Sequence, residues 1–523
     1  MDLIVVPPLT DFTTAVLPPS GVEVLDLNER VVERLADPSR LKAAAERLDG
    51  GPLAALLERA AAAVLERKAF DDAHLRAVGT ALRLAADPAV RLSIDDLELA
   101  EGSTQSSGDV LGAAGRCELF RPETELAVEV ARGRRAHVVV DDGRQLPEAF
   151  ALVGALGAGR VTLCGRLVAE QGAALRRVPA LAGVELLAWS PERVIRPLWY
   201  DTAPFERVRP GQCWDVAPAR WARPCDGPDV APAGRASLCD APDTQPGKRV
   251  RWVTGACPPP ASGPWAGWLD AVGVAAYPEE VLARCRGLTI VVTRIDFLAA
   301  VTGLNGVTVD LRRLLAGIPP GVPVTCELVL GAPGMEAGVV GESVELLAAG
   351  AGGVRLAGLR PYRMAIRTEW AGQSVRFPPH AGDDLARWID FDAPDTMRAY
   401  EVAAMIRSWL GRLPGLPAGR LAACSVAGRE PAPGQDRGGD GPAPAWDPCA
   451  EVVQGGAGPD GDGPGTFAVS LRSGRSLRLR PYQVAPVSRL AADDPHALDA
   501  LTERARTELT AGLAQAGVLR GRG

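Results

Sequence analysis

The sequence predicts an α/β fold, and three observations lead to that prediction. Apolar strand-like runs alternate with amphipathic helical segments along most of the 523 residues. The strand-like runs are apolar almost throughout, as expected for a parallel sheet that is covered on both faces. Most of them stop at Gly, Pro, Asp or Asn, residues that turn the chain. The length of the chain suggests two or three domains.

The first predicted sheet comes from five runs: residues 3–8 (LIVVPP), 22–28 (VEVLDLN), 136–143 (AHVVVDDG), 160–165 (RVTLCG) and 184–189 (VELLAW). Residues 29–90 predict two or three helices, broken at Pro38 and Gly50. Only 13 residues separate the first two runs, which is short for a parallel crossover that includes a helix. We therefore expect that this helix is missing or that the two strands are not adjacent.

Candidate ligand-binding residues lie where the predicted parallel strands end. Ligands of such sheets bind beyond the carboxyl ends of the strands. This rule places Asp141, Asp142 and Gly143 beside a cleft, together with Gly165 and Arg166. The same residues are also explained by a simple turn, because Asp-Gly can link the strand to a helix and cap it near Gln145 and Leu146.

A second α/β region is predicted over residues 288–364, after a stretch rich in Pro, Gly, Trp and Arg at about 197–265. Here GAPG (331–334) follows a strand and precedes a helix, so Gly331, Gly334 and Glu336 are candidate cofactor-binding residues. The alternative is a tight turn. Further candidates at strand ends, each with an alternative reading as a surface residue or an ion pair, are Arg360, Tyr362, Arg367, Arg294 and Asp296.

The last part of the chain has less regular patterns. Residues 382–394 (GDDLARWIDFDAP) predict an amphipathic helix capped by Asp383 or Asp384, or alternatively a contact with a substrate or partner. The composition of 426–465 predicts a disordered linker. Residues 466–484 predict a hairpin around Ser473 and Gly474, and a final helix is expected at about 494–517.

Charge and cysteine content exclude several functions. The net charge of −7 offers no basic field to attract nucleic acid or a membrane surface. No run approaches the roughly 18 apolar residues of a membrane span, and an acidic second residue without a basic stretch argues against a signal peptide. The ten cysteines are dispersed, without a CxxC pair. We expect a cytoplasmic protein.

Several segments, in this order, resemble the cobalamin-dependent radical S-adenosylmethionine enzymes, and most closely the C-methyltransferase-like maturases of ribosomally made peptides. The similar segments are VVPP with GVEVLDLN near the N-terminus, QLPEAFALVGALGAGRVTLCGRLV (145–168), DTAPFERVRPGQC (201–213), VTCELVLGAPGMEAGVVGESVELL (324–347) and LAGLRPYRMAIRTEW (356–370). The resemblance covers about residues 1–410.

The resemblance implies a domain order and two cofactors. It implies a Rossmann-like, cobalamin-binding-like domain over 1–196 and a partial TIM-like βα barrel over 197–425, followed by the linker and a small C-terminal element over 466–523. Cobalamin would contact Asp141, Asp142, Gly143 and Gly165. S-adenosylmethionine would lie near the loop of Gly331, Gly334 and Glu336.

The chain departs from the family at its hallmark, C-x-x-x-C-x-x-C, which holds a [4Fe–4S] cluster. Clustered thiolates need close spacing on a short loop, whereas the candidates here, Cys213, Cys225 and Cys239, are widely spaced. A cluster is therefore not expected.

Two functions remain open. The first is a degenerate scaffold or accessory protein that docks a precursor peptide or a biosynthetic partner protein. The alternative is a methyltransferase that depends on cobalamin and S-adenosylmethionine.

Overall fold

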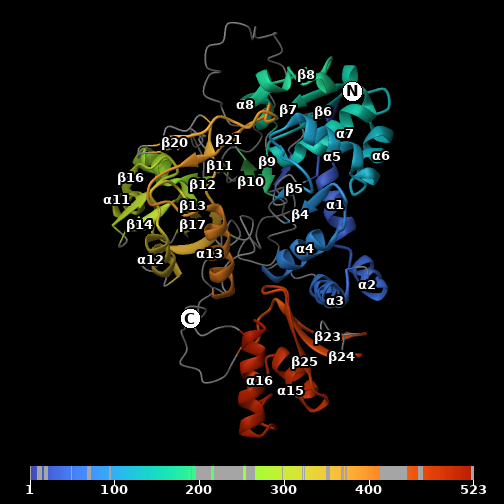
Figure 1. Cartoon of the computed structure of the whole chain (residues 1–523), viewed down its shortest axis with the longest axis vertical. Helices are drawn as coiled ribbons and strands as arrows, with labels where there is room; N and C mark the ends of the chain where they lie inside the picture. Colours follow the sequence, from blue (N-terminus) through green and yellow to red (C-terminus); the bar gives the residue numbers. More distant parts are fainter. Residues whose placement is uncertain are drawn as a thin grey trace.

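The structure is a computed structural model, and it confirms the predicted α/β class. It describes residues 2–8, 14–16, 22–48, 50–67, 72–93, 96–189, 191, 193–195, 214–216, 251–254, 265–296, 299–320, 322, 324–348, 354–366, 370, 374–412, 445–456 and 463–519. Two large sheets lie beside each other, and a C-terminal element lies at one end of the molecule (Figure 1).

The first sheet is parallel throughout, with the order β3-β1-β6-β7-β8. Its strands are β1 (Leu3–Val6), β3 (Glu23–Asp26), β6 (Ala136–Val139), β7 (Val161–Cys164) and β8 (Glu185–Leu186). All four residues of β1 and of β7 are buried, as expected for strands covered on both faces. On one face the apolar side chains pack against α5 (Ser107–Arg116), α6 (Arg121–Val130) and α7 (Leu146–Leu156).

A strand, not a helix, lies in the short connection between β1 and β3. These two strands are adjacent and parallel, with Leu3 opposite Glu23, so the helix is missing from the described part of the connection. In its place β2 (Thr14–Val16) pairs with β9 (Arg193–Ile195) at the edge of the second sheet. Val16 packs on Ile4 and Val6. The connection therefore joins the two sheets.

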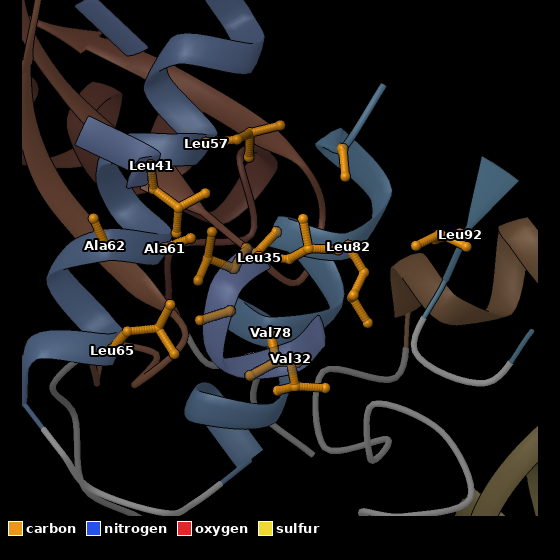
Figure 2. Packing of buried hydrophobic residues seen from close by; sticks show 14 of the residues in the cluster. Val32, Leu35, Leu41, Leu57, Ala61, Ala62, Leu65, Val78, Leu82 and Leu92 are labelled. Atoms are coloured by element: carbon orange, nitrogen blue, oxygen red, sulfur yellow. The ribbon is translucent and has the colours of Figure 1, made fainter. Parts of the chain in front are cut away.

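A group of helices is inserted between β3 and β6: α1 (Leu27–Leu35), α2 (Pro38–Arg47), α3 (Pro52–Glu66) and α4 (Asp72–Leu84). The short hairpin of β4 (Val90–Leu92) and β5 (Leu97–Leu99) follows them. Figure 2 shows Leu35, Val78 and Leu82 gathered between these helices, all nearly inaccessible to solvent. The Ala- and Leu-rich sequence thus provides a tightly packed helical core.

The second sheet has the order β18-β17-β13-β12-β11-β10-β9-β2. Six strands from β10 to β18 follow one another in chain order and are parallel: β10 (Trp214–Val216), β11 (Arg251–Thr254), β12 (Trp265–Asp270), β13 (Cys285–Val292), β17 (Val324–Leu330) and β18 (Arg355–Pro361). One face is apolar and packs on α9 (Ala271–Ala275), α11 (Leu311–Ala316) and α12 (Ala337–Ala348).

Smaller elements decorate the second sheet. The strands are β14 (Arg294–Asp296), β15 (Ala300–Thr302), β16 (Thr308–Asp310), β19 (Met364–Ala365), β20 (Val375–Arg376), β21 (Trp388–Ile389) and β22 (Phe391–Asp392). The helices beside it are α10 (Glu279–Leu282) and α13 (Ala399–Arg412). Helix α8 (Arg166–Leu175) and the 3-10 turns η1 (Gly143–Gln145), η2 (Ala158–Arg160) and η3 (Pro179–Leu181) belong instead to the first sheet, where they contact β7 or α7.

The prediction of a helix over 382–394 is wrong. This segment forms β21, which pairs with β19, and β22, which pairs with β20. Leu385 is nevertheless buried, in the core of the first sheet. Pairing with two other strands and contacts with a distant sheet override the helical spacing of the apolar residues.

The C-terminal element is an antiparallel sheet of β23 (Ala450–Gly455), β24 (Gly465–Ser470) and β25 (Arg475–Leu479), with α15 (Pro481–Ala491) and α16 (Glu503–Gln515). The hairpin predicted around Ser473 and Gly474 is confirmed, and Gly474 has a φ of +68°. Part of the linker predicted over 426–465 forms β23, which contacts α3, and residues 457–462 of it lie outside the described residues. Residues 413–444 lie outside the described residues.

None of the described helices combines the length and apolar character that crossing a bilayer requires.

Candidate functional site

The carboxyl edge of the first sheet carries the first group of predicted residues. Asp142 caps η1 by accepting a hydrogen bond from the Arg144 amide at 3.3 Å, and the Gln145 side chain accepts from the amides of Asp141 and Asp142 at 2.6 and 3.1 Å. This reciprocal arrangement is a capping box. The strand-to-helix turn that the sequence offered as the alternative reading of these residues is present.

Asp141 and Gly165 bring the ends of β6 and β7 together. The Asp141 Oδ1 accepts from the Arg166 amide at 2.9 Å. Gly165 has a φ of +109°, and a Cβ there would lie 2.5 Å from the Val140 carbonyl oxygen. Only glycine fits this backbone without strain. Gly143 has more room, since its nearest neighbours are atoms of Thr104.

Three arginines surround the Asp142 carboxylate. Arg144, Arg166 and Arg387 lie at 4.0, 3.7 and 3.7 Å from its oxygens. Burial raises the pKa of Asp142, but the three guanidinium groups and the Arg144 amide outweigh burial and hold the pKa well below its ordinary value. Asp142 is therefore ionised at neutral pH, and it organises positive charge from three parts of the chain.

A segment that follows the last strand of the second sheet in the chain lies over this edge. We call residues 383–397 the bridging segment. The Leu385 amide donates to the Gln105 carbonyl at 2.8 Å, and the amides of Arg387 and Trp388 donate to the Gln105 Oε1 at 2.8 and 2.7 Å. Leu385 is only 3% exposed. The bridging segment thus covers part of the edge beside Asp142, and about 33% of the Asp142 side chain remains exposed.

Two further sets of hydrogen bonds attach the bridging segment to α5 and α8. Asp384 accepts from the Ser107 amide and hydroxyl at 2.7 and 2.6 Å, at the start of α5. The Gln171 side chain of α8 donates to the Ala386 carbonyl at 3.1 Å. Together with the Gln105 contacts this makes six hydrogen bonds. Such a network contributes several kcal/mol, at about 1 kcal/mol per bond.

The second group of predicted residues lies at the end of β17, and the structure does not bring it to the first. Gly331 has a φ of +86°, and a Cβ there would lie 2.6 Å from the Val402 side chain of α13. The Gly334 amide donates to the Thr396 hydroxyl at 2.9 Å. Glu336 lines a groove between α12 and α13. The two glycines thus serve a tight turn that packs against α13.

The bridging segment connects these two places. It contacts Asp142 and Gln105 through Arg387, and it reaches the β17 turn through Thr396 and through the Met397 amide, which donates to the Met335 carbonyl at 3.3 Å. In Figure 1 its strand β21 lies between the two large sheets. The carboxyl ends of β6 and β17 are therefore joined by one continuous stretch of chain.

The predicted residue Arg360 belongs to a polar group on the second sheet whose other members, Trp268 and Glu327, sequence reasoning missed. Strand alternation places Trp268, Glu327 and Arg360 on the face opposite the helix-covered apolar core. The Arg360 Nε donates to Glu327 at 2.7 Å, and the guanidinium lies 5.3 Å from the centre of the Trp268 ring. The signal in the sequence is a glutamate within an otherwise apolar strand, VTCELVL. Arginine also offers further N–H donors, which suit a carboxylate or phosphate.

The remaining predicted residues have structural partners or lie outside the described residues. Arg294 and Asp296 form an ion pair at 2.6 Å. The Tyr362 hydroxyl donates to the Leu304 carbonyl at 3.0 Å, and its ring packs edge-on against Trp370 and Phe391. Burial raises the pKa of Tyr362, so it acts as a hydrogen-bond donor. Arg367 is outside the described residues.

The candidate cluster ligands Cys213, Cys225 and Cys239 also lie outside the described residues. In the part of the chain that the structure describes, no group of His, Cys, Asp or Glu has the arrangement of a metal site. The described thiols are mostly buried, and burial raises the pKa of Cys117 to about 12 and that of Cys326 still further. Such thiols remain protonated and unreactive.

We compared the chain with protein families, with curated proteins and with solved structures, and none of them matched it.

Proposed function

We propose that the chain is a degenerate member of the cobalamin-binding radical S-adenosylmethionine family, which acts as a scaffold or accessory protein in peptide or natural-product biosynthesis. In this proposal the first sheet is a Rossmann-like, cobalamin-binding-like domain and the second is a partial TIM-like βα barrel. The strand orders support it. In chain order the first sheet reads 2-1-3-4-5, a doubly wound order, and six strands of the second sheet are parallel and consecutive.

The bridging segment over the carboxyl edge beside Asp142 is the observation that carries the scaffold proposal. Ligands of doubly wound sheets bind outside this edge. Here Arg387 lies 3.7 Å from Asp142 and beside Gly143, so the bridging segment competes with a corrin ring for these residues while it is in place. Displacing that segment would break six hydrogen bonds and expose a leucine, at a cost of roughly 5 kcal/mol or more.

The hallmark cysteine spacing points the same way. The sequence has no C-x-x-x-C-x-x-C, and a cluster with ligands spread over longer loops costs more chain entropy to assemble. A chain without the cluster has no electron source for radical chemistry. The scaffold proposal explains both features, because docking a peptide or a partner enzyme requires neither cofactor.

The strand orders also favour a second candidate, the cobalamin- and S-adenosylmethionine-dependent methyltransferase. The switch point of the first sheet lies between β1 and β6, and β6 ends at the predicted residues Asp141 and Asp142. This candidate requires the bridging segment to leave Asp142 before cobalamin binds.

One experiment separates the two candidates. The full chain is produced with iron and cobalamin supplementation, purified anaerobically, and analysed for iron, cobalt and its visible spectrum. The scaffold proposal expects a colourless protein, and it expects the same for the Arg387→Ala variant. One corrin per chain in the wild type would overturn the proposal in favour of the methyltransferase. About four irons with cluster absorption would restore the radical enzyme.

A further inference from the structure

A groove with a volume of about 770 Å³ lies between α12 and α13, away from the edge at Asp142. Its α12 side is lined by Glu336, Ala337 and Gly341, and its other side is lined by one face of α13. Small residues on both walls leave space for another segment to approach the backbone closely.

One face of α13 lines the groove. Glu401, Ala404, Met405 and Ser408 recur at spacings of three and four residues, which places them on one side of the helix. Trp409 and Tyr400 also line the groove, and Tyr400 is 66% exposed. Tyrosine, tryptophan and methionine are the residue types enriched at protein interfaces. This face therefore has the composition of a docking surface.

The charged side chains among the described residues that line the groove are all acidic. Glu336, Asp395 and Glu401 line it, and none of the described residues that line it is basic. The Glu401 carboxylate accepts a hydrogen bond from the Arg398 amide at 2.7 Å, which fixes it at the start of α13. Carboxylates around an apolar floor complement a partner that is apolar on one side and positively charged around it.

We infer that this groove docks a cationic amphipathic peptide segment, such as a helix that presents apolar residues at helical spacing with arginine or lysine beside them. The inference deepens the scaffold proposal and rests on it for the class of partner. The groove shares Asp395, Thr396 and Met397 with the bridging segment, but Asp142 and Arg387 do not line it, so the groove is tested through variants of Glu336, Glu401 and Tyr400.

The test uses the full chain and three fluorescently labelled peptides of about 14 residues, long enough for a helix of several turns. The first carries Leu and Arg at amphipathic spacing, the second is a scrambled isomer, and the third has Glu in place of Arg. Fluorescence anisotropy at about 50 and 200 mM salt measures their affinities. We expect the first to bind most tightly, with weaker binding at the higher salt concentration.

Two matched pairs of variants locate the binding. Glu336→Gln with Glu401→Gln is expected to weaken binding about five- to tenfold, as loss of two partly exposed charge contacts does. Its control is Glu279→Gln with Glu280→Gln, the same charge change on the exposed residues of α10. Tyr400→Ala is compared with Tyr482→Ala, since both tyrosines are largely exposed but only Tyr400 lines the groove.

The inference is overturned if the scrambled isomer binds equally well, if control and groove variants lose the same affinity, or if no peptide binds. Sedimentation velocity adds one outcome against it: a dimer of the chain that the groove variant dissociates would assign the groove to a second copy. Cobalamin bound in the spectroscopic experiment would overturn the scaffold proposal but would not change the result of the peptide experiment. Failure of the peptide to bind would overturn this inference but would leave the scaffold proposal standing.

Discussion

At the scale of single residues, the positions that tolerate substitution least are those where neighbouring elements surround the backbone or a charged side chain. Gly165 meets the β6 backbone, and Asp142 lies among three arginines. Glu148 is 4% exposed and receives a hydrogen bond from Thr124 at 2.7 Å. Each of these residues contacts partners on another element, so a substitution there is expected to change the stability of the chain.

Gly165→Ala is expected to destabilise the chain by about 2 kcal/mol or more, because the new Cβ would be placed 2.5 Å from the Val140 oxygen at a positive φ. Gly154→Ala is the matched control. Gly154 lies within α7, and a Cβ there meets no atom within 4 Å, so alanine should stabilise by about 0.5–1 kcal/mol. Urea unfolding of both variants measures the difference, and an equal effect would contradict the prediction.

Glu148→Gln is expected to stabilise the chain at high pH. Burial raises the pKa of Glu148 from 4.5 to about 8, and the nearby Glu123 adds to this. Since the folded pKa is the higher one, the stability contribution is complete below pH 4.5 and is lost as the pH rises through 8. The variant should therefore match the wild type at pH 4 and exceed it at pH 9, by at most about 5 kcal/mol.

Melting temperatures measured from pH 4 to 9 test this expectation. Glu46→Gln, at an exposed position of α2, serves as the control and should not gain stability over the wild type between pH 4 and pH 9. A constant difference between Glu148→Gln and the wild type at every pH would be against the prediction.

At the scale of elements, the C-terminal sheet completes the core of the N-terminal helices. Phe467 of β24 and Val453 of β23 belong to the same buried cluster as Leu56 of α3. Gly455 is required at this contact, because a Cβ there would lie 2.7 Å from the Leu56 side chain. Arg67, just after α3, also forms an ion pair with Glu451. These elements are far apart in sequence but share one apolar interior.

Phe467→Ala is expected to lower stability by about 3–5 kcal/mol, because it leaves a cavity beside α3. The loss should appear in the unfolding of α1–α4, followed by hydrogen exchange of their amides. The control Phe377→Ala changes an exposed phenylalanine and should alter stability by less than about 0.5 kcal/mol. Protection of α1–α4 that is unchanged by Phe467→Ala would show that the two parts are not coupled.

At the scale of the whole molecule, the bridging segment determines how the two large sheets are related at their carboxyl ends. Gln105 is its main anchor, since one side-chain oxygen accepts from two amides of the segment. Gln105→Ala leaves both amides unpaired, which costs about 1–3 kcal/mol for each. We expect hydrogen exchange at residues 385–388 to accelerate at least tenfold.

Gln454→Ala is the comparison for that measurement. It removes an exposed side-chain contact with Thr466 in the C-terminal sheet, and exchange at residues 385–388 should not change. Equal acceleration in both variants would mean that global stability, not the Gln105 anchor, protects the segment.

The sequence was informative where periodicity is local. The strands ending at Asp141 and at Gly331 were predicted within a few residues, because apolar runs and turn residues suffice to locate them. The helix over 382–394 was wrong, since its conformation is fixed by β19, β20 and Gln105. Arg387 was missed for the same reason: nothing near it in the sequence indicates that it lies against Asp142.

The shared core of α1–α4 and the C-terminal sheet has a consequence for biosynthesis. Strands β23 and β24 leave the ribosome long after the helices, so those helices carry an unfinished apolar surface throughout most of translation. Chaperones that recognise such surfaces would hold the nascent chain until Phe467 and its neighbours arrive. A chain that ends before residue 450 is therefore expected to leave this apolar surface of α1–α4 uncovered.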